Sequence, residues 1–232
     1  MTRSLACASL LTFALACSAP STADRRDSAA ELLPPASGPL HIAAGEESPT
    51  LEELVNELSR LTGVTTTASE AVRLSLRNQR LALSGQISIP PSEVYPWVEG
   101  LLDQHGFVVA VVSDRPPHLL AIQAKMPLPP DGAPGPFLSI PAERVAELSA
   151  HPALLVQTVV DLPHLDVRMI GNSLRQLFVG EVSSGVLPVA QSSSMILAGT
   201  GRQVSGVYAM LREIDEKARI ASEAEAARKE TR

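Results

Sequence analysis

The sequence has 232 residues, enough for one large or two small domains. Aromatic residues make up only 3% of it and there are 19 prolines, so we expect cores of Leu, Val, Ile and Ala without large aromatic binding platforms. The net charge of -6 is spread without a basic cluster, which argues against binding to nucleic acid, since that needs concentrated Lys and Arg.

The amino terminus has the features of an export signal. Thr2 and Arg3 precede a short apolar run, Leu5–Ala16, which is about the size of a signal-peptide core and too short to span a bilayer. We therefore expect residues 1–17 to hold a signal peptide whose apolar segment is removed.

The end of this segment resembles a bacterial lipobox. In Ala14-Leu15-Ala16-Cys17 a cysteine follows small residues, although the Leu usual three places before the cysteine is Ala14 here. The resemblance implies that Cys17 is lipidated, and Ser18 after it implies an outer-membrane anchor. The alternative is an ordinary signal peptide cut near Ala19 or Ala23.

Residues 18–39 are rich in Ala, Ser, Pro and mixed charge, and we expect a flexible tether. A first module is predicted over residues 40–125. It begins with a helix after Thr50 and Glu53, which have the spacing of a capping box, and Gly63 ends that helix. The apolar residues of the helix recur on one face: Leu51, Leu54, Val55, Leu58 and Leu61.

Two alternating segments follow, and the pattern predicts two half-buried strands. In the first, Val72, Leu74 and Leu76 face one way, and Arg73, Ser75 and Arg77 face the other. In the second, Leu81, Leu83, Ile87 and Ile89 share a face before Pro90 and Pro91 break the strand. Arg73, Ser75 and Arg77 are the candidate interface residues, as side chains on an exposed strand edge.

The remainder of this module is predicted to be a helix and a hairpin. Ser92 is placed to cap a helix that Gly106 stops, with Val94, Trp97, Val98, Leu101 and Leu102 on its apolar face. Residues 107–112 and 119–122 are then expected to pair around a turn.

Residues 126–152 are expected to form a linker. Five prolines between positions 127 and 136 favour an extended, semi-rigid spacer. Residues 141–149 then suit one short helix with Val145 and Leu148 inward.

A second module is predicted over residues 153–215 with the order βαββα. A strand at 154–162 precedes a helix capped by Asp166, whose apolar face carries Val167, Ile170, Leu174, Leu177 and Phe178. Residues 186–190 and 195–198 are expected to pair antiparallel, Gly199 and Gly201 to form a turn, and residues 204–215 to be helical. Residues 216–232, rich in Ala, Glu, Lys and Arg, are predicted to extend that helix as a charged tail.

The predicted fold class is therefore α+β with two small modules. The second module resembles the second amino-terminal periplasmic module of bacterial secretins. The resemblance is carried by Val159-Val160-Asp161-Leu162, the helix Val167–Phe178, and Ser194-Met195-Ile196-Leu197-Ala198-Gly199-Thr200 before the last helix. The module departs from the family in having Ser193-Ser194-Met195 where an Asn-Ser-Leu step is usual. The first module, through residues 89–122, resembles the first secretin module, which is shared with the signalling domain of TonB-dependent receptors.

The sequence shows no pattern for catalysis or for holding a metal or cofactor. The five histidines lie on separate elements with no two at i, i+4 spacing, and Gly199-Thr200-Gly201 lacks the Lys-Ser or Lys-Thr step of a phosphate loop. Ser192, Ser193 and Ser194 lack a nucleophile-elbow context. We expect neither an enzyme nor a channel from this chain alone.

The resemblance implies a non-enzymatic periplasmic adaptor of a secretin-based secretion or pilus system. Its expected partners are a secretin barrel or other secretion proteins, including an inner-membrane component, and further copies of itself in a ring. Two alternatives stay open: a TonB-receptor-like signalling module that binds a regulator, and a ligand-binding envelope lipoprotein with a site in the insert Met126–Ser149.

Overall fold

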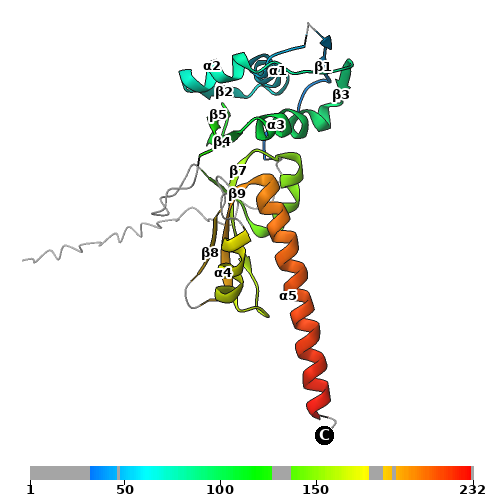
Figure 1. Ribbon diagram of the computed structural model, residues 1–232, viewed down its shortest axis with the longest axis vertical. Coiled ribbons are helices and arrows are strands. Elements are labelled where there is room, and N and C mark those ends of the chain that lie inside the picture. The colour runs from blue at the N-terminus through cyan, green and yellow to red at the C-terminus, as the bar shows by residue number, and fades with distance from the viewer. Residues whose placement is uncertain (1–31, 46–47, 127–136, 178–184, 190–191, 231–232) are drawn as a thin grey trace, which may run out of the picture. The chain divides into compact units, whose positions relative to one another are not determined.

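The computed structural model describes residues 32–45, 48–126, 137–177, 185–189 and 192–230 (Figure 1). The described residues all belong to one compact unit. The fold is α+β, as predicted, with sheets of two, three and four strands in the described part. We call residues 32–126 the first half and residues 137–230 the second half. The predicted signal peptide, Cys17 and most of the predicted tether lie outside the described residues.

The first half holds three α-helices and two small sheets (Figure 1). Strands β1 and β3 pair antiparallel, and the other sheet has the order β2-β5-β4. The elements in chain order are β1 (Leu40–Ile42), α1 (Leu51–Thr62), β2 (Thr65–Ala68), α2 (Glu70–Asn78), β3 (Ile87–Ile89), η3 (Pro91–Glu93), α3 (Val94–Gln104), β4 (Phe107–Ser113) and β5 (Leu119–Ala124).

Helix α1 begins and ends where its sequence signals predict. The Glu53 N–H donates to Thr50 Oγ1 at 3.2 Å, and the Thr50 N–H donates to Glu53 Oε2 at 2.7 Å, so the capping box is complete. Gly63 ends the helix with a left-handed φ of 71°, a conformation that costs glycine little. The predicted apolar face is buried.

The strand predicted around Val72, Leu74 and Leu76 is wrong, because these residues lie on helix α2. Ser69 caps the helix by accepting from the Val72 N–H. Leu76 is buried and Val72 packs beside the core, whereas Leu74 is 48% exposed. Val72 and Leu76 are four apart and share one helical face, while Leu74 points away from it. The strand in this region is β2, which precedes the helix.

The second predicted strand is only partly correct, since Ile87–Ile89 form β3 and residues 81–83 are not in a strand. Helix α3 lies where it was predicted, but Ser92 does not cap it: the 3-10 turn η3 leads into the helix instead. Gly106 follows α3 with a φ of 80°. The predicted hairpin is confirmed as β4 and β5, which pair antiparallel.

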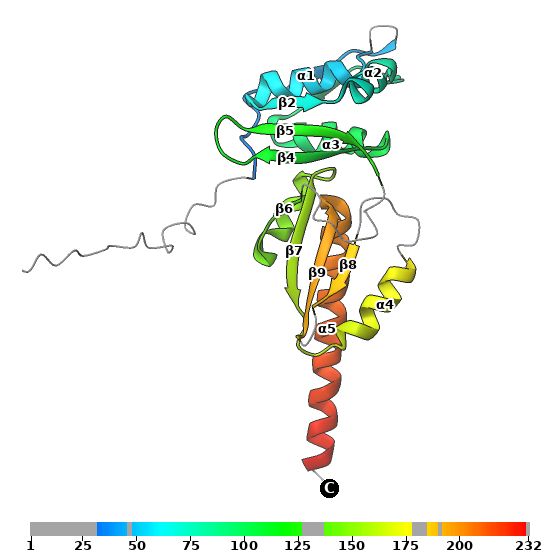
Figure 2. The ribbon, with the colours of Figure 1, turned by 90° about the vertical axis from the view of Figure 1, so that its left-hand side faces the viewer.

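In the second half, two helices cover one face of a four-stranded sheet of order β6-β7-β9-β8. Figure 2 shows β7, β9 and β8 side by side, with α5 behind them. The elements are β6 (Leu138–Ser139), η4 (Ala142–Ala150), β7 (Leu155–Asp161), α4 (Val167–Leu177), β8 (Gly185–Pro188), β9 (Ser194–Thr200) and α5 (Gly201–Glu230). The predicted antiparallel pairing of β8 with β9 is confirmed.

Local signals explain the helices of this half. Asp166 Oδ1 accepts from the N–H groups of Arg168 and Met169, so the predicted cap of α4 is confirmed. In η4, Val145 and Leu148 are buried, as predicted. Phe178 and the prolines of the predicted spacer lie outside the described residues.

Helix α5 starts directly after β9. Gly199 belongs to the strand and Gly201 to the helix, so the turn predicted at both glycines is wrong. The predicted extension of the last helix is confirmed, since α5 continues to Glu230. No helix in the described part of the chain combines the length and the apolar character needed to cross a membrane.

Candidate functional site

A polar cleft of about 270 Å³ lies where α1, β2 and α2 meet. Its floor is apolar and consists of the buried side chains of Val55, Leu76 and Ile122. The other lining residues, most of them polar, are Glu52, Asn56, Thr66, Thr67, Ala68 and Arg73. An apolar floor under a polar rim is a common arrangement of binding sites.

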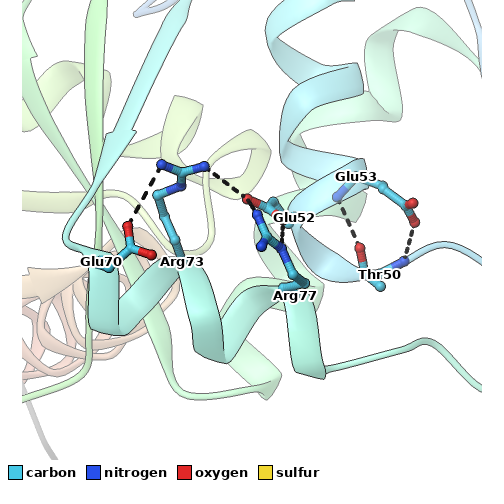
Figure 3. Close-up of polar contacts among 6 residues, drawn as sticks. All are labelled: Thr50, Glu52, Glu53, Glu70, Arg73 and Arg77. Carbon is cyan, nitrogen blue, oxygen red and sulfur yellow. Dashed lines mark hydrogen bonds and ion pairs between the residues drawn. The ribbon is translucent and has the colours of Figure 1, made fainter.

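Ion pairs between α1 and α2 order the rim of the cleft (Figure 3). Arg77 Nε and Nη2 donate to the two carboxylate oxygens of Glu52 at 2.8 and 3.2 Å. Arg73 lies farther away, with Nη2 at 3.5 Å from Glu52 Oε1 and Nη1 at 3.8 Å from Glu70 Oε2. The short bidentate pair therefore fixes Arg77, and the long contacts leave the Arg73 guanidinium less constrained.

The same contacts favour the charged forms of Glu52 and Arg77 on this rim. The hydrogen bond from Arg77, aided by the positive charges of Arg77 and Arg73, lowers the pKa of Glu52 below its usual value. The hydrogen bond to Glu52, together with its negative charge, raises the pKa of Arg77. Both groups are therefore charged at neutral pH, and the rim presents fixed charges of both signs to a partner.

Among the described residues, strand β2 lies at the edge of its sheet, beside this cleft. It pairs in parallel with β5, and the Thr65 N–H donates to His118 O at 3.0 Å. Because alternate residues of a parallel strand bond to the same neighbour, the main-chain groups of Thr66 and Ala68 point away from β5. Both residues line the cleft. An extended chain placed there has main-chain donors and acceptors to pair with.

Two of the three predicted interface residues, Arg73 and Arg77, lie at this cleft, although the reason given for all three was wrong. Arg73, Ser75 and Arg77 lie on helix α2 and not on a strand edge. Arg73 lines the cleft and Arg77 holds its rim through Glu52. The Thr65–Thr67 run, rich in β-branched residues, was the sequence signal for the neighbouring strand.

A second surface lies on the face of the four-stranded sheet opposite α4 and α5. Val159 is paired with Ile196, and Ile196 with Leu187, so the three side chains form a row across β7, β9 and β8. Val159 is 55% exposed and Leu187 is 48% exposed. Three aligned apolar side chains on an open sheet face are a candidate contact for another protein.

The described residues contain no group of three or more His, Cys, Asp or Glu side chains arranged to hold a metal ion. The insert that the ligand-binding alternative requires is only partly described: residues 127–136 lie outside the described residues, and η4 packs Val145 and Leu148 into the core.

A scan against models of protein families finds no match, and a search of curated protein sequences finds none either. Among solved structures, the chain is similar to one from the Klebsiella pneumoniae type II secretion system outer membrane complex, which contains PulD, PulS and the PulC HR domain. That match has 18% identity, a TM-score of 0.47 and covers 72% of this chain and 25% of that one.

Two further similarities are to the N-terminal domain of the secretin XcpQ from Pseudomonas aeruginosa and to the GspC-GspD complex of enterotoxigenic Escherichia coli. The first has 15% identity, a TM-score of 0.23 and covers 77% of this chain and 64% of that one. The second has 12% identity, a TM-score of 0.27 and covers 77% of this chain and 99% of that one.

The chain thus spans about a quarter of the length of the Klebsiella chain and just under two thirds of the XcpQ chain. One of them, XcpQ, is a secretin, which is the family that the sequence resembles. The likeness concerns fold alone, and what each of those proteins assembles with is a property of that protein.

Proposed function

We propose that this protein is a non-enzymatic periplasmic adaptor of a secretin-based secretion system, and that it acts by binding other proteins. The open edge of β2 beside the polar cleft is the observation that carries the proposal. The assignment to secretion draws on the sequence resemblance of the two modules, and the assignment to binding draws on the geometry of the cleft.

The partner that fits the cleft is an extended segment of another secretion component. Its main chain adds to β2 through the outward groups of Thr66 and Ala68, and an apolar side chain rests on the floor at Val55 and Leu76. An acidic side chain pairs with Arg73, whose side chain is 52% exposed. An inner-membrane component is the expected source of this segment.

The module boundaries and the anchor are part of the same proposal. We place the modules at residues 40–125 and 153–215, joined by residues 126–152, and a lipid on Cys17 at the outer membrane. Cys17→Ser should abolish incorporation of labelled palmitate and move the protein from the membrane fraction to the soluble fraction. If Cys17→Ser still incorporates the label, the anchor lies elsewhere.

The row Val159, Ile196 and Leu187 supports contact between copies, because a helix of a second copy packed on this face buries all three side chains. Val159→Lys should then lower the sedimentation coefficient of the assembled protein, whereas Met169→Lys, at an exposed position of α4 on the other side of the sheet, should leave it unchanged. Equal sedimentation of the two variants and the wild type would remove this contact.

The experiment that tests the proposal is site-specific photocrosslinking in native envelopes. A photoreactive residue replaces Thr67 beside the cleft, and a matched control replaces Asp114, which is exposed in the β4–β5 turn. Capture of a secretin barrel protein or an inner-membrane secretion component from position 67 alone supports the proposal. Arg73→Glu should reduce that capture, and Ser75→Ala should not.

The alternative functions predict other crosslinked partners. Capture of an anti-sigma regulator would favour the signalling module. Crosslinking from position 67 that does not exceed the control at 114 would overturn the cleft as the binding site.

A further inference from the structure

A buried carboxylate connects the two halves of the chain. Glu99 lies on α3 in the first half and is 1% exposed. Its Oε1 lies 2.9 Å from His151 Nδ1, and its Oε2 accepts from the N–H of Ala153 at 3.1 Å. A carboxylate only accepts hydrogen bonds, so Nδ1 of His151 carries the proton in this contact. Both donors belong to the segment that leads into β7.

His151 is itself enclosed, with 7% of its surface exposed. Its ring meets the ring of Tyr95 edge to face at a centroid distance of 5.0 Å, and Tyr95 is on α3, one turn before Glu99. Two residues of one helix in the first half therefore hold one side chain from the second half.

Strand β4 meets the same segment by its main chain. The Val109 N–H donates to Ala153 O at 3.0 Å, and Val109 forms a parallel bridge with Leu154. Next to this bridge, Val108 and Ala110 form a small apolar cluster with Leu155. The edge of β4 that faces away from β5 is thus covered by the start of β7.

The other side of the segment is bonded to the start of α5. The Gly201 N–H donates to Leu154 O at 2.8 Å, and the Arg202 N–H donates to Pro152 O at 3.2 Å. The Arg202 side chain also reaches Asp103 of α3, with Nε 4.0 Å from Oδ2. Residues 151–155 are therefore bonded to elements of both halves at once.

We propose that Glu99 and His151 form a latch that fixes the two halves of this chain in a single relative orientation. Removing the carboxylate leaves the His151 Nδ1–H and the Ala153 N–H without their acceptor, and removing the imidazole leaves a buried charge with one donor fewer. In either case the halves lose this buried polar contact, and the angle between them then depends on the remaining main-chain and apolar contacts around Val109 and Leu155. This proposal does not rest on the secretion assignment.

The latch is tested by measuring distances between the halves in the full chain. With Cys7 and Cys17 replaced by serine, nitroxide labels on Asn78→Cys and Ala209→Cys report one distance across the halves, since both positions are exposed. The labelled protein with Glu99 and His151 unchanged should give a narrow distribution of distances between the two labels. Glu99→Ala and His151→Ala should broaden it by about twofold or more, because the segment 151–155 then loses its side-chain hydrogen bonds to α3 and keeps its main-chain and apolar contacts to β4.

Three controls make the result specific. His151→Asn keeps an N–H donor near the position of Nδ1 and should keep the narrow distribution. Glu93→Ala and His105→Ala change exposed residues at the two ends of α3 and should also keep it. Amide hydrogen exchange in β5 and β9 should be unchanged in all variants, because each sheet remains folded.

Two results would overturn the proposal. One is a narrow distribution in both Glu99→Ala and His151→Ala. The other is a loss of amide protection within β5 or β9 in these variants, because Glu99 and His151 would then support the sheets themselves and not the angle between the halves.

Discussion

Gly201 lies directly against the main chain of His151, so closely that a Cβ atom at position 201 would overlap the His151 carbonyl oxygen. This approach lets the Gly201 N–H reach Leu154 O and lets α5 start immediately after β9. The glycine is therefore required by the packing of its neighbour, and the same segment holds the Glu99 contact.

Gly201→Ala should lower the free energy of unfolding by about 2–3 kcal/mol, because the methyl group must displace the main chain of residues 148–151. The matched control is Gly206→Ala on the same helix, where an added Cβ meets no atom within 4 Å. That change should stabilise the protein by up to about 1 kcal/mol, since alanine is the better helix former. Urea unfolding of both variants checks this, and equal stabilities would contradict it.

Thr50→Ala should lower the free energy of unfolding by about 1 kcal/mol, because the Glu53 N–H then loses its side-chain acceptor at the start of α1. Thr50→Ser keeps the hydroxyl and should restore all but a few tenths of that loss. Thermal unfolding of the three proteins under one condition measures the difference. A Thr50→Ser variant as unstable as Thr50→Ala would show that the hydroxyl is not the stabilising group.

Helices α1 and α4 could be predicted from the sequence because their signals are local. The side chains of Thr50, Glu53 and Asp166 accept hydrogen bonds from main-chain N–H groups only two or three residues away. These contacts therefore depend little on the rest of the fold. Helix α2 was predicted as a strand because the six residues 72–77, with alternating polarity, fit both the helical and the strand period. Ser69 and Glu70 carried the correct signal, since a cap and an acidic first residue mark a helix start.

The cleft could not be predicted, because it depends on contacts between segments far apart in the sequence. Glu52 meets Arg77 across a separation of 25 residues, and Ile122 of β5 supplies part of the floor. Strands β1 and β6 have three and two residues, too few to show a period of two, and they are strands only because a distant partner pairs with them. The same holds for the Glu99 and His151 contact, for which neither residue has a local signal.

The Glu52 and Arg77 pair should make stability depend on pH in the acid range. Because the folded state lowers the pKa of Glu52, the pair stabilises the protein fully above the usual glutamate pKa of about 4.5, and this stabilisation is lost as the pH falls through the lowered value. The difference in melting temperature between the wild type and Glu52→Gln should thus be constant near neutral pH and shrink in acid.

The control for this pair is the same comparison in an Arg77→Ala background, where the difference should be smaller and nearly independent of pH, because Arg77 is the main cause of the lowered pKa. Added salt should weaken the effect as well, since the pair is near the surface. A difference that grows as the pH falls would show that the charged form of Glu52 is unfavourable in the folded protein.

Asp215 should stabilise the loop that precedes α4. It is buried on α5, and its Oδ1 accepts from the His164 N–H at 3.0 Å, so it joins the long helix to the segment after β7. Asp215→Ala should lower the free energy of unfolding by about 1–3 kcal/mol, because the His164 N–H is left without this acceptor. It should also speed amide exchange in the first turn of α4.

The control is Glu216→Ala, which changes the next residue. Glu216 is exposed and pairs with Arg219, so this variant should leave both stability and exchange nearly unchanged. If the two variants behave alike, the loop is held by its apolar residues, Leu162 and Leu165, and not by Asp215.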